Sequence, residues 1–335
     1  MIWIAVDAMG GDEAPRHIVD GALAAARHFD LGVLLVGRAA AIDAELANTF
    51  FVDKSRVKIV DTPDAVDMKD PSPGSTLRRT PGASIRVAAD AVARGDAAAL
   101  VSAGHTGATV MAAHAAFGML PGVDRPALAA VIPTRKKPAL LLDVGASVEC
   151  RPPHLLQFAV MGSMFARVVY DIAVPRVGLL SIGHEETKGN ELTREAHQLL
   201  KASPVHFIGN VEARDVYSGG ADVIVCDGFT GNVALKTSEG LVELVEGLLS
   251  DELSSTFTNR VGSLLTRRAT RHIRMRVDYS ESGGAPLLGV AGVTIVGHGR
   301  SSAKAVRNAV AMAYRFATTS FIQRVGQEIA AASPA

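Results

Sequence analysis

The sequence contains very little cysteine. Only Cys150 and Cys226 occur among 335 residues, and they lie far apart in the chain. Two separated cysteines are too few for a disulfide framework or a thiolate metal site, so a reducing compartment is favoured. No basic region precedes the acid at Asp7, which argues against a secretory signal. No apolar stretch approaches the roughly 18 residues that cross a bilayer, so we expect a cytoplasmic protein. Peripheral association with a membrane surface stays open.

An excess of charge of either sign is also missing. Lys+Arg and Asp+Glu both number 34, so the total charge predicts neither a nucleic-acid partner nor its absence, and only local clusters are informative. The hydrophobic share of 48% is that of a globular chain, long enough for one large or two ordinary domains.

The usual nucleotide and nucleophile motifs are absent. There is no Gly-Lys dipeptide, no G-x-G-x-x-G after the first apolar run and no G-x-S-x-G. The segment HEETK begins like a zinc-protease helix, but Lys188 stands where the second histidine belongs. Carboxylates with tight metal-ligand spacing are not found either. We therefore expect no metal and no cofactor, and neither a kinase, a dehydrogenase nor a serine hydrolase.

Short apolar runs rich in Val, Ile and Leu alternate with helical patterns along the chain. Most runs are continuously apolar, as in strands that helices cover on both faces. This order predicts a largely parallel α/β sheet with helices on both faces. The expected strands cover residues 2–6, 32–37, 57–60, 98–102, 128–132, 139–143, 177–182, 205–208, 223–226 and 293–297.

Several of these strands end in a short loop that carries Gly, Asn or Ser before a helix. If all strands were parallel, these loops would share one edge of the sheet, where ligands bind. Glycine permits close approach of the backbone, and a helix start offers unpaired N–H groups, so the loops together predict an anion-binding cleft. They are DAMGGDEAP, SAGHTGA, DVGAS, IGHEETKGN, DGFTGN and GHGRSS.

Six ordered motifs resemble one family. VDAMGGDEAP, SAGHTGA, LLDVGASVECRPPHLLQFAVMGS, VGLLSIGHEETKGNE, FIGNVEARDV and DVIVCDGFTGNVALKTSEG look like those of the bacterial phosphate acyltransferases. The match runs from residue 2 to about residue 315 and includes APLLGVAGVTIVGHGRSS. His105 and Ser147 stand where the family pattern has asparagine.

The resemblance implies a reaction and a fold. The reaction transfers a long-chain fatty acyl group from acyl-acyl-carrier-protein to inorganic phosphate, giving acyl phosphate for phospholipid synthesis. The fold is two-lobed and similar to phosphotransacetylases and to isocitrate and isopropylmalate dehydrogenases. We expect residues 1–119 plus 286–335 in the first lobe and 120–285 in the second, with an amphipathic helical hairpin at about 233–277.

This reaction needs positioned charges rather than an activated Ser or Cys, because phosphate is already an anion and a thiol is a good leaving group. Lys188, at a helix start where a cation is unfavourable, is the first candidate for pairing with phosphate. His105 and Asn232 complete the expected catalytic set. Asp7, Asp12, Asp143 and Asp227 are interpreted as loop organisers, because carboxylates repel phosphate. The expected phosphate- and substrate-binding residues are Gly10, Gly11, Ser102, Gly104, Thr106, Gly107, Asn190, Asn210, Gly228, Gly231, Lys236 and His298.

Residues 254–277 hold six arginines, one histidine and no acid. Apolar residues recur at helical spacing in the first part, and residues 273–277 alternate as in a strand. The apolar stripe is expected to pack within the protein or against a second copy, since the resemblance implies a homodimer. The arginines fit either the acidic carrier protein or anionic lipid beside the membrane acyltransferase that uses acyl phosphate. They are Arg260, Arg267, Arg268, Arg271 and Arg274; nucleic acid is not an expected partner.

Two alternatives stay open at the level of the sequence. A phosphotransacetylase that uses acyl-coenzyme A would share the anion cleft. A non-catalytic regulator that binds phosphate or acyl groups on the same fold would also share it, without turnover of a thioester. A metal-dependent dehydrogenase is the rival at the level of the fold.

Overall fold

The computed structural model describes residues 1–49, 53–277 and 283–332, without the side chains of 269, 272–277 and 330–332. The strands within these residues form one sheet in the order β3-β2-β1-β4-β11-β10-β5-β6-β9-β7-β8. Their bounds are β1 Ile2–Asp7, β2 Leu31–Gly37, β3 Val57–Asp61, β4 Ala99–Ser102, β5 Ala127–Ile132, β6 Ala139–Leu142, β7 Val177–Ser181, β8 Phe207–Glu212, β9 Val223–Val225, β10 Ala285–Leu288 and β11 Val293–Val296.

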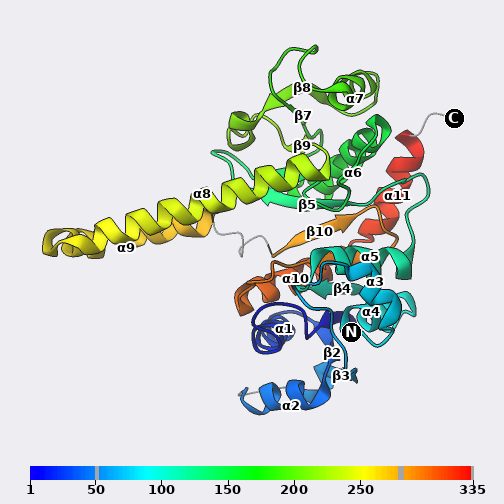
Figure 1. Cartoon of the computed structure of the whole chain (residues 1–335), viewed down its shortest axis with the longest axis vertical. Helices are drawn as coiled ribbons and strands as arrows, with labels where there is room; N and C mark the ends of the chain where they lie inside the picture. Colours follow the sequence, from blue (N-terminus) through cyan, green and yellow to red (C-terminus); the bar gives the residue numbers. More distant parts are fainter. Residues whose placement is uncertain (50–52, 278–282, 333–335) are drawn as a thin grey trace.

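The helices connect the strands and cover both faces of the sheet, so the predicted α/β class is confirmed (Figure 1). The α-helices are α1 Arg16–His28, α2 Ala39–Ala47, α3 Pro73–Arg79, α4 Ser84–Ala93, α5 Thr106–Phe117, α6 Pro152–Tyr170, α7 Glu191–Lys201, α8 Gly228–Ser255, α9 Phe257–Val277, α10 Ala303–Thr318 and α11 Phe321–Ala332. Two short 3-10 helices, η1 Lys54–Arg56 and η2 Ala213–Tyr217, complete the described elements.

Two parallel blocks run in opposite directions within the sheet. Strands β3, β2, β1, β4 and β11 are parallel to one another, and so are β6, β9, β7 and β8. Between the blocks, β10 is antiparallel to both of its neighbours, and β6 is antiparallel to β5. The expectation that all six loops share one sheet edge is therefore wrong. The division of the chain into lobes at residues 119 and 286 stays a prediction, although the second of these boundaries falls within β10, Ala285–Leu288.

Two apolar layers pack on the sheet, one on each face. Along β1, Ile4 and Val6 belong to the layer under α1 and α10, whereas Ala5 belongs to the layer under α4 and α5. This alternation is the period of two that a strand imposes. In the second block, α6 and α7 continue the first layer, and the start of α8 joins the second layer through Ala234 and Leu235.

A cluster of aromatic rings joins helices from the two blocks. Phe165 of α6 is fully buried and meets the rings of Phe316 and Phe321 edge-on, at centroid distances of 5.7 and 6.2 Å. The rings of Phe316 and Phe321 stack at 4.5 Å. Because edge-to-face and stacked pairs add to the gain from burial, this cluster fastens α10 and α11 of one block to α6 of the other.

Phe165→Ala is expected to lower the free energy of unfolding by about 3–5 kcal/mol, because it removes a buried ring and leaves a cavity. Phe165→Leu should lose less, since more of the volume stays filled. Denaturant titration followed by circular dichroism measures both changes. Phe29→Ala, at a ring that is 39% exposed, is the control. Equal losses in Phe165→Ala and the control would show that the cluster does not hold the blocks together.

Candidate active site

Asp7, the last residue of β1, organises the glycine loop that follows this strand. Its carboxylate is buried and accepts hydrogen bonds from the hydroxyls of Ser84 at 2.7 Å and Ser102 at 2.8 Å. Burial raises the pKa of the Asp7 carboxyl, and these hydrogen bonds counteract that rise. The loop approaches so closely that a Cβ on Gly10 would lie 2.5 Å from Asp7 Oδ2 and 2.7 Å from the Gly104 nitrogen. The glycine at position 10 therefore lets the loops after β1 and β4 touch.

Asp143 plays the same part in the second block. Its carboxylate is fully buried and accepts N–H bonds from Leu128 at 2.8 Å, Gly145 and Ala146 at 3.0 Å, and Ser147 at 2.6 Å. Burial raises the pKa of this carboxyl as well, and the backbone donors oppose the rise. A single side chain thus shapes the loop after β6 and fastens it to the start of β5.

The first turn of α8 packs against that loop. A Cβ on Gly228 would lie 2.7 Å from Asp143 Oδ2, and one on Gly231 would overlap the Asp143 carbonyl. Asp227 caps the helix by accepting the N–H of Thr230 at 2.9 Å. Close packing at the two glycines brings Asn232 to the loop after β6. The following turn of α8 then carries Lys236 to His298 of the first block.

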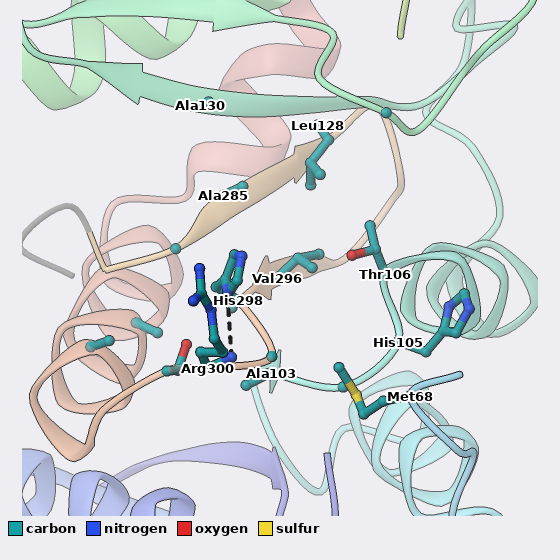
Figure 2. Close-up of a pocket in the computed structure, with 18 of the residues that line it drawn as sticks. Met68, Ala103, His105, Thr106, Leu128, Ala130, Ala285, Val296, His298 and Arg300 are labelled. Carbon is teal, nitrogen blue, oxygen red and sulfur yellow. Dashed lines mark hydrogen bonds between the residues drawn. The ribbon is translucent and has the colours of Figure 1, made fainter. Parts of the chain in front are cut away.

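A cavity of about 630 Å³ lies where β10 and β5 join the two blocks (Figure 2). Five of the six predicted loops contribute residues to it: those that follow β1, β4, β6, β9 and β11. The apolar part of its lining includes Val101, Leu128, Ala130, Val131, Val144, Leu235, Val296 and Val306. The polar side chains that line it are Asp12, Lys69, His105, Thr106, Asn232, Lys236, Glu239, His298, Arg300 and Ser301.

Lys236 and His298 form a polar contact across the cavity. Lys236 Nζ, on α8, lies 3.1 Å from His298 Nε2, in the loop after β11, and donates to Glu239 at 2.7 Å. The His298 ring is also 3.9 Å from Glu239 and accepts the N–H of Arg300 at 3.2 Å. Burial lowers the pKa of the His298 imidazole, and the Lys236 ammonium lowers it further. A neutral imidazole and a cation therefore meet at neutral pH.

His105 begins α5 on another side of the cavity (Figure 2). Its Nδ1 accepts the N–H of Ala108 at 3.4 Å, so the side chain caps the helix. Gly104, Thr106 and Gly107 line the cavity beside it. The start of α5 thus adds the partial positive charge of a helix N-terminus to the polar lining of the cavity.

The structure brings only part of the predicted set together. His105, Asn232, Gly104, Thr106, Gly107, Lys236 and His298 line the cavity. Gly10, Ser102, Gly228 and Gly231 pack in the loops around it and do not line it, and neither does Gly11. Lys188 and Asn190 do not line it; they follow β7, and Asn190 caps α7 by accepting the N–H of Thr193.

Asn210 is held by the same remote part of the sheet. Its side chain is buried, donates to the Glu185 carbonyl at 2.8 Å and lies 2.9 Å from His197 Nδ1. Sequence reasoning did not select Glu239, Arg300 or Lys69 for the site. A signal for the first was its position one helical turn after Lys236, and Arg300 stands inside the quoted loop GHGRSS.

The helices α8 and α9 form a hairpin that projects from the body of the molecule (Figure 1). The expected strand at residues 273–277 is wrong, because α9 continues to Val277. Arg260, Arg267, Arg268 and Arg271 are exposed on α9, and the side chain of Arg274 lies outside the described residues. Of the helices described, none combines the length and the apolar character that crossing a membrane requires.

Solved structures share this fold. The chain aligns over 98% of its length with 94% of a phosphotransacetylase from Streptococcus pyogenes, with a TM-score of 0.63 and 16% identity. It aligns over 95% of its length with 99% of a branched-chain phosphotransacylase from Enterococcus faecalis, with a TM-score of 0.53 and 15% identity. The fold therefore belongs to the phosphotransacetylase-like class of α/β proteins.

Sequence relatives are much closer. A family model described as fatty acid synthesis protein matches residues 2–324. The chain is 50% identical to the phosphate acyltransferase of Heliobacterium modesticaldum over 326 residues, 97% of each chain. It is 48% identical to the phosphate acyltransferase of Acidobacterium capsulatum over 328 residues, 98% of this chain and 97% of that one. The chain belongs to the phosphate acyltransferase family and is an enzyme, which confirms the resemblance seen in its motifs.

The charges around His298 predict opposite shifts of its pKa in two variants. Lys236→Met should raise the pKa toward the ordinary value of 6.5 by removing a cation, and Glu239→Gln should lower it by removing an anion. Because the folded-state pKa is depressed, the stabilising contribution of neutral His298 is present above the ordinary value and is lost as the pH falls through the folded pKa. Proton NMR titration of the imidazole measures the shifts, with the signal assigned by its loss in His298→Gln. Unchanged values in both variants would contradict the contact.

Proposed function

We propose that this enzyme transfers a long-chain fatty acyl group from acyl-acyl-carrier-protein to inorganic phosphate, giving acyl phosphate for phospholipid synthesis. One observation carries the proposal: a single cavity is lined both by apolar side chains and by polar groups that include Lys236, His298 and the start of α5. An acyl thioester lies with its chain against the apolar side chains, and phosphate binds at the polar groups beside the thioester carbonyl.

The chemistry is a substitution at the carbonyl carbon. A phosphate oxygen attacks this carbon, a C–O bond forms, and the C–S bond breaks with its electron pair on sulfur. The thiolate leaves readily because the pKa of a thiol is only about 8.5, and at neutral pH it then takes up a proton. The enzyme needs to hold anionic phosphate against the thioester carbonyl and to stabilise the carbonyl oxygen as it becomes negative.

Lys236 supplies the positive charge for phosphate in this proposal. Its ammonium lies at the cavity between Glu239 and His298, from which it can turn to an entering anion. Neutral His298 exchanges a proton with phosphate or with the departing sulfur, which the depressed pKa permits at neutral pH. Backbone N–H groups at the start of α5, together with His105 and Asn232, face the developing oxyanion.

Turnover of the carrier-bound substrate is the direct test. Incubation of the full chain with palmitoyl-acyl-carrier-protein and phosphate is expected to release the carrier thiol and to form acyl phosphate in equal amounts, and neither without phosphate. Reaction with palmitoyl-coenzyme A alone would replace the carrier by coenzyme A and make the enzyme a phosphotransacetylase. If neither donor reacts, the proposed function is wrong.

Lys236→Ala is expected to lower kcat/KM for phosphate about 10²–10³-fold, the usual loss when a charge-stabilising donor is removed. Lys188→Ala, measured in parallel, tests the assignment drawn from the sequence. Lys201→Ala is the matched control, because Lys201 is an exposed lysine of α7 that pairs with Glu186 in the loop after β7. A larger loss in Lys188→Ala than in Lys236→Ala would move the phosphate site to the loop after β7.

We further propose that the hairpin of α8 and α9 contacts a second copy of the chain. Exposed apolar side chains form a stripe on α8: Leu241, Leu244, Val245 and Leu248. Helix α8 carries Glu239, Glu243, Glu246, Asp251 and Glu252 against the single cation Lys236, whereas α9 carries only basic charges. Acidic α8 of one copy therefore complements basic α9 of another, and an acidic α8 suits a protein surface better than anionic lipid. We propose that the arginines of α9 that stay exposed in the dimer bind the acidic acyl carrier protein.

Leu244→Asp with Leu248→Asp is expected to convert a dimer into a monomer, because two buried charges would oppose the contact. Sedimentation velocity at micromolar concentration measures the mass. Leu199→Asp, at an exposed leucine of α7, should stay dimeric. A wild-type monomer that binds anionic vesicles through the hairpin would assign the stripe to the membrane instead.

A further inference from the structure

A cluster of metal-ligating side chains lies apart from the cavity, at the carboxyl ends of β7 and β8. His184 comes from the loop after β7, Glu212 ends β8, and Asp215 belongs to η2. His184 Nε2 lies 3.2 Å from Asp215 Oδ2 and 3.6 Å from Glu212 Oε1. All three ligand atoms lie within 4.8 Å of one another. None of the three residues lines the cavity described above.

The surroundings orient each ligand toward the others. His184 Nδ1 lies 3.3 Å from the Asn210 carbonyl, a contact that places the proton on Nδ1 and leaves the lone pair of Nε2 facing the carboxylates. Arg214 holds the second oxygen of Glu212 at 3.0 Å, which leaves Oε1 for the cluster. Asp215 Oδ2 is buried and receives no hydrogen bond in the described structure. A buried carboxylate oxygen beside a lone pair requires a positive charge between them.

We propose that His184, Glu212 and Asp215 bind a divalent d-block cation such as Zn²⁺. Zinc binds imidazole nitrogen and carboxylate oxygen at about 2.0–2.2 Å, so tetrahedral ligands lie about 3.4 Å apart. The two separations of 3.2 and 3.6 Å bracket that value. The nitrogen ligand disfavours Mg²⁺ and Ca²⁺, which prefer oxygen. His184 is exposed, so the ion has an entry path and keeps an open position for water or an anion.

The site also accounts for the segment HEETK. In the sequence this segment begins like a zinc-protease helix but lacks the second histidine on the same helix. The structure brings carboxylates from β8 and η2 to His184 instead. A bound ion would link the loop after β7 to η2. The same loop is also held by the hydrogen bond that the Asn210 amide donates to the Glu185 carbonyl.

The test uses the full chain after dialysis against a chelator. Titration with ZnCl₂ in a calorimeter is expected to show one site per chain, and CoCl₂ is expected to give a visible absorption band that Zn²⁺ displaces and Mg²⁺ does not. His184→Ala and Asp215→Asn should each weaken binding at least about 10-fold. Zn²⁺ should raise the melting temperature of the wild type and not that of the variants.

His206→Ala is the matched control, because His206 is an exposed histidine in the segment before β8 and is not part of the cluster. It should bind Zn²⁺ as the wild type does. The proposal is overturned if the wild type takes up no stoichiometric Zn²⁺. It is equally overturned if His184→Ala and Asp215→Asn bind as tightly as the wild type. Thermal unfolding of the metal-free variants shows that they are folded.

Discussion

The loops around the cavity depend on two buried carboxylates. Asp143 accepts four backbone N–H bonds, one from β5 and three from the loop after β6. Asp7 ties the loop after β1 to Ser102 of β4. Burying a carboxylate without such donors would cost several kcal/mol of folding free energy. The two aspartates therefore favour the loop conformations that supply these hydrogen bonds. Because Gly228 and Gly231 then pack directly on the Asp143 loop, the position of α8 follows from the same constraint.

The reversal of strand direction sets what the cavity can combine. Antiparallel β10 and β5 join the two parallel blocks, and the cavity lies over that join. One block contributes helix starts and His298, and the other contributes α8 with Lys236. Lys236 and His298 thus reach the cavity from different blocks. In a sheet with all strands parallel, every loop would lie at a single edge.

Much of this architecture could be predicted from local sequence. Continuously apolar runs gave ten strands, and the glycine loops indicated the site, because both signals depend only on nearby residues. Strand β10 was missed since Pro286 lies inside it, and proline argues against a strand. Residues 273–277 fit a strand by alternation, yet Ile273 and Val277 also lie four apart, as on one face of a helix. Lys188 came first among the predicted phosphate ligands because a cation at a helix start is unfavourable, and this assignment stays a prediction. The strand order, which places β7 beside the edge strand β8, is a long-range property that the sequence does not show.

The ion pair between Lys236 and Glu239 is weak enough to exchange for another anion. Glu239 neutralises Lys236 while the cavity is without an anion, and the pair is close to the surface, so its attraction is modest. In the proposed reaction, an entering phosphate carries more charge than one carboxylate and approaches the start of α5 as well, so it competes favourably for the ammonium. His298 stays neutral beside that ammonium because a second cation in a half-buried position would be repelled. The same contact therefore holds Lys236 at the cavity and keeps the His298 imidazole neutral.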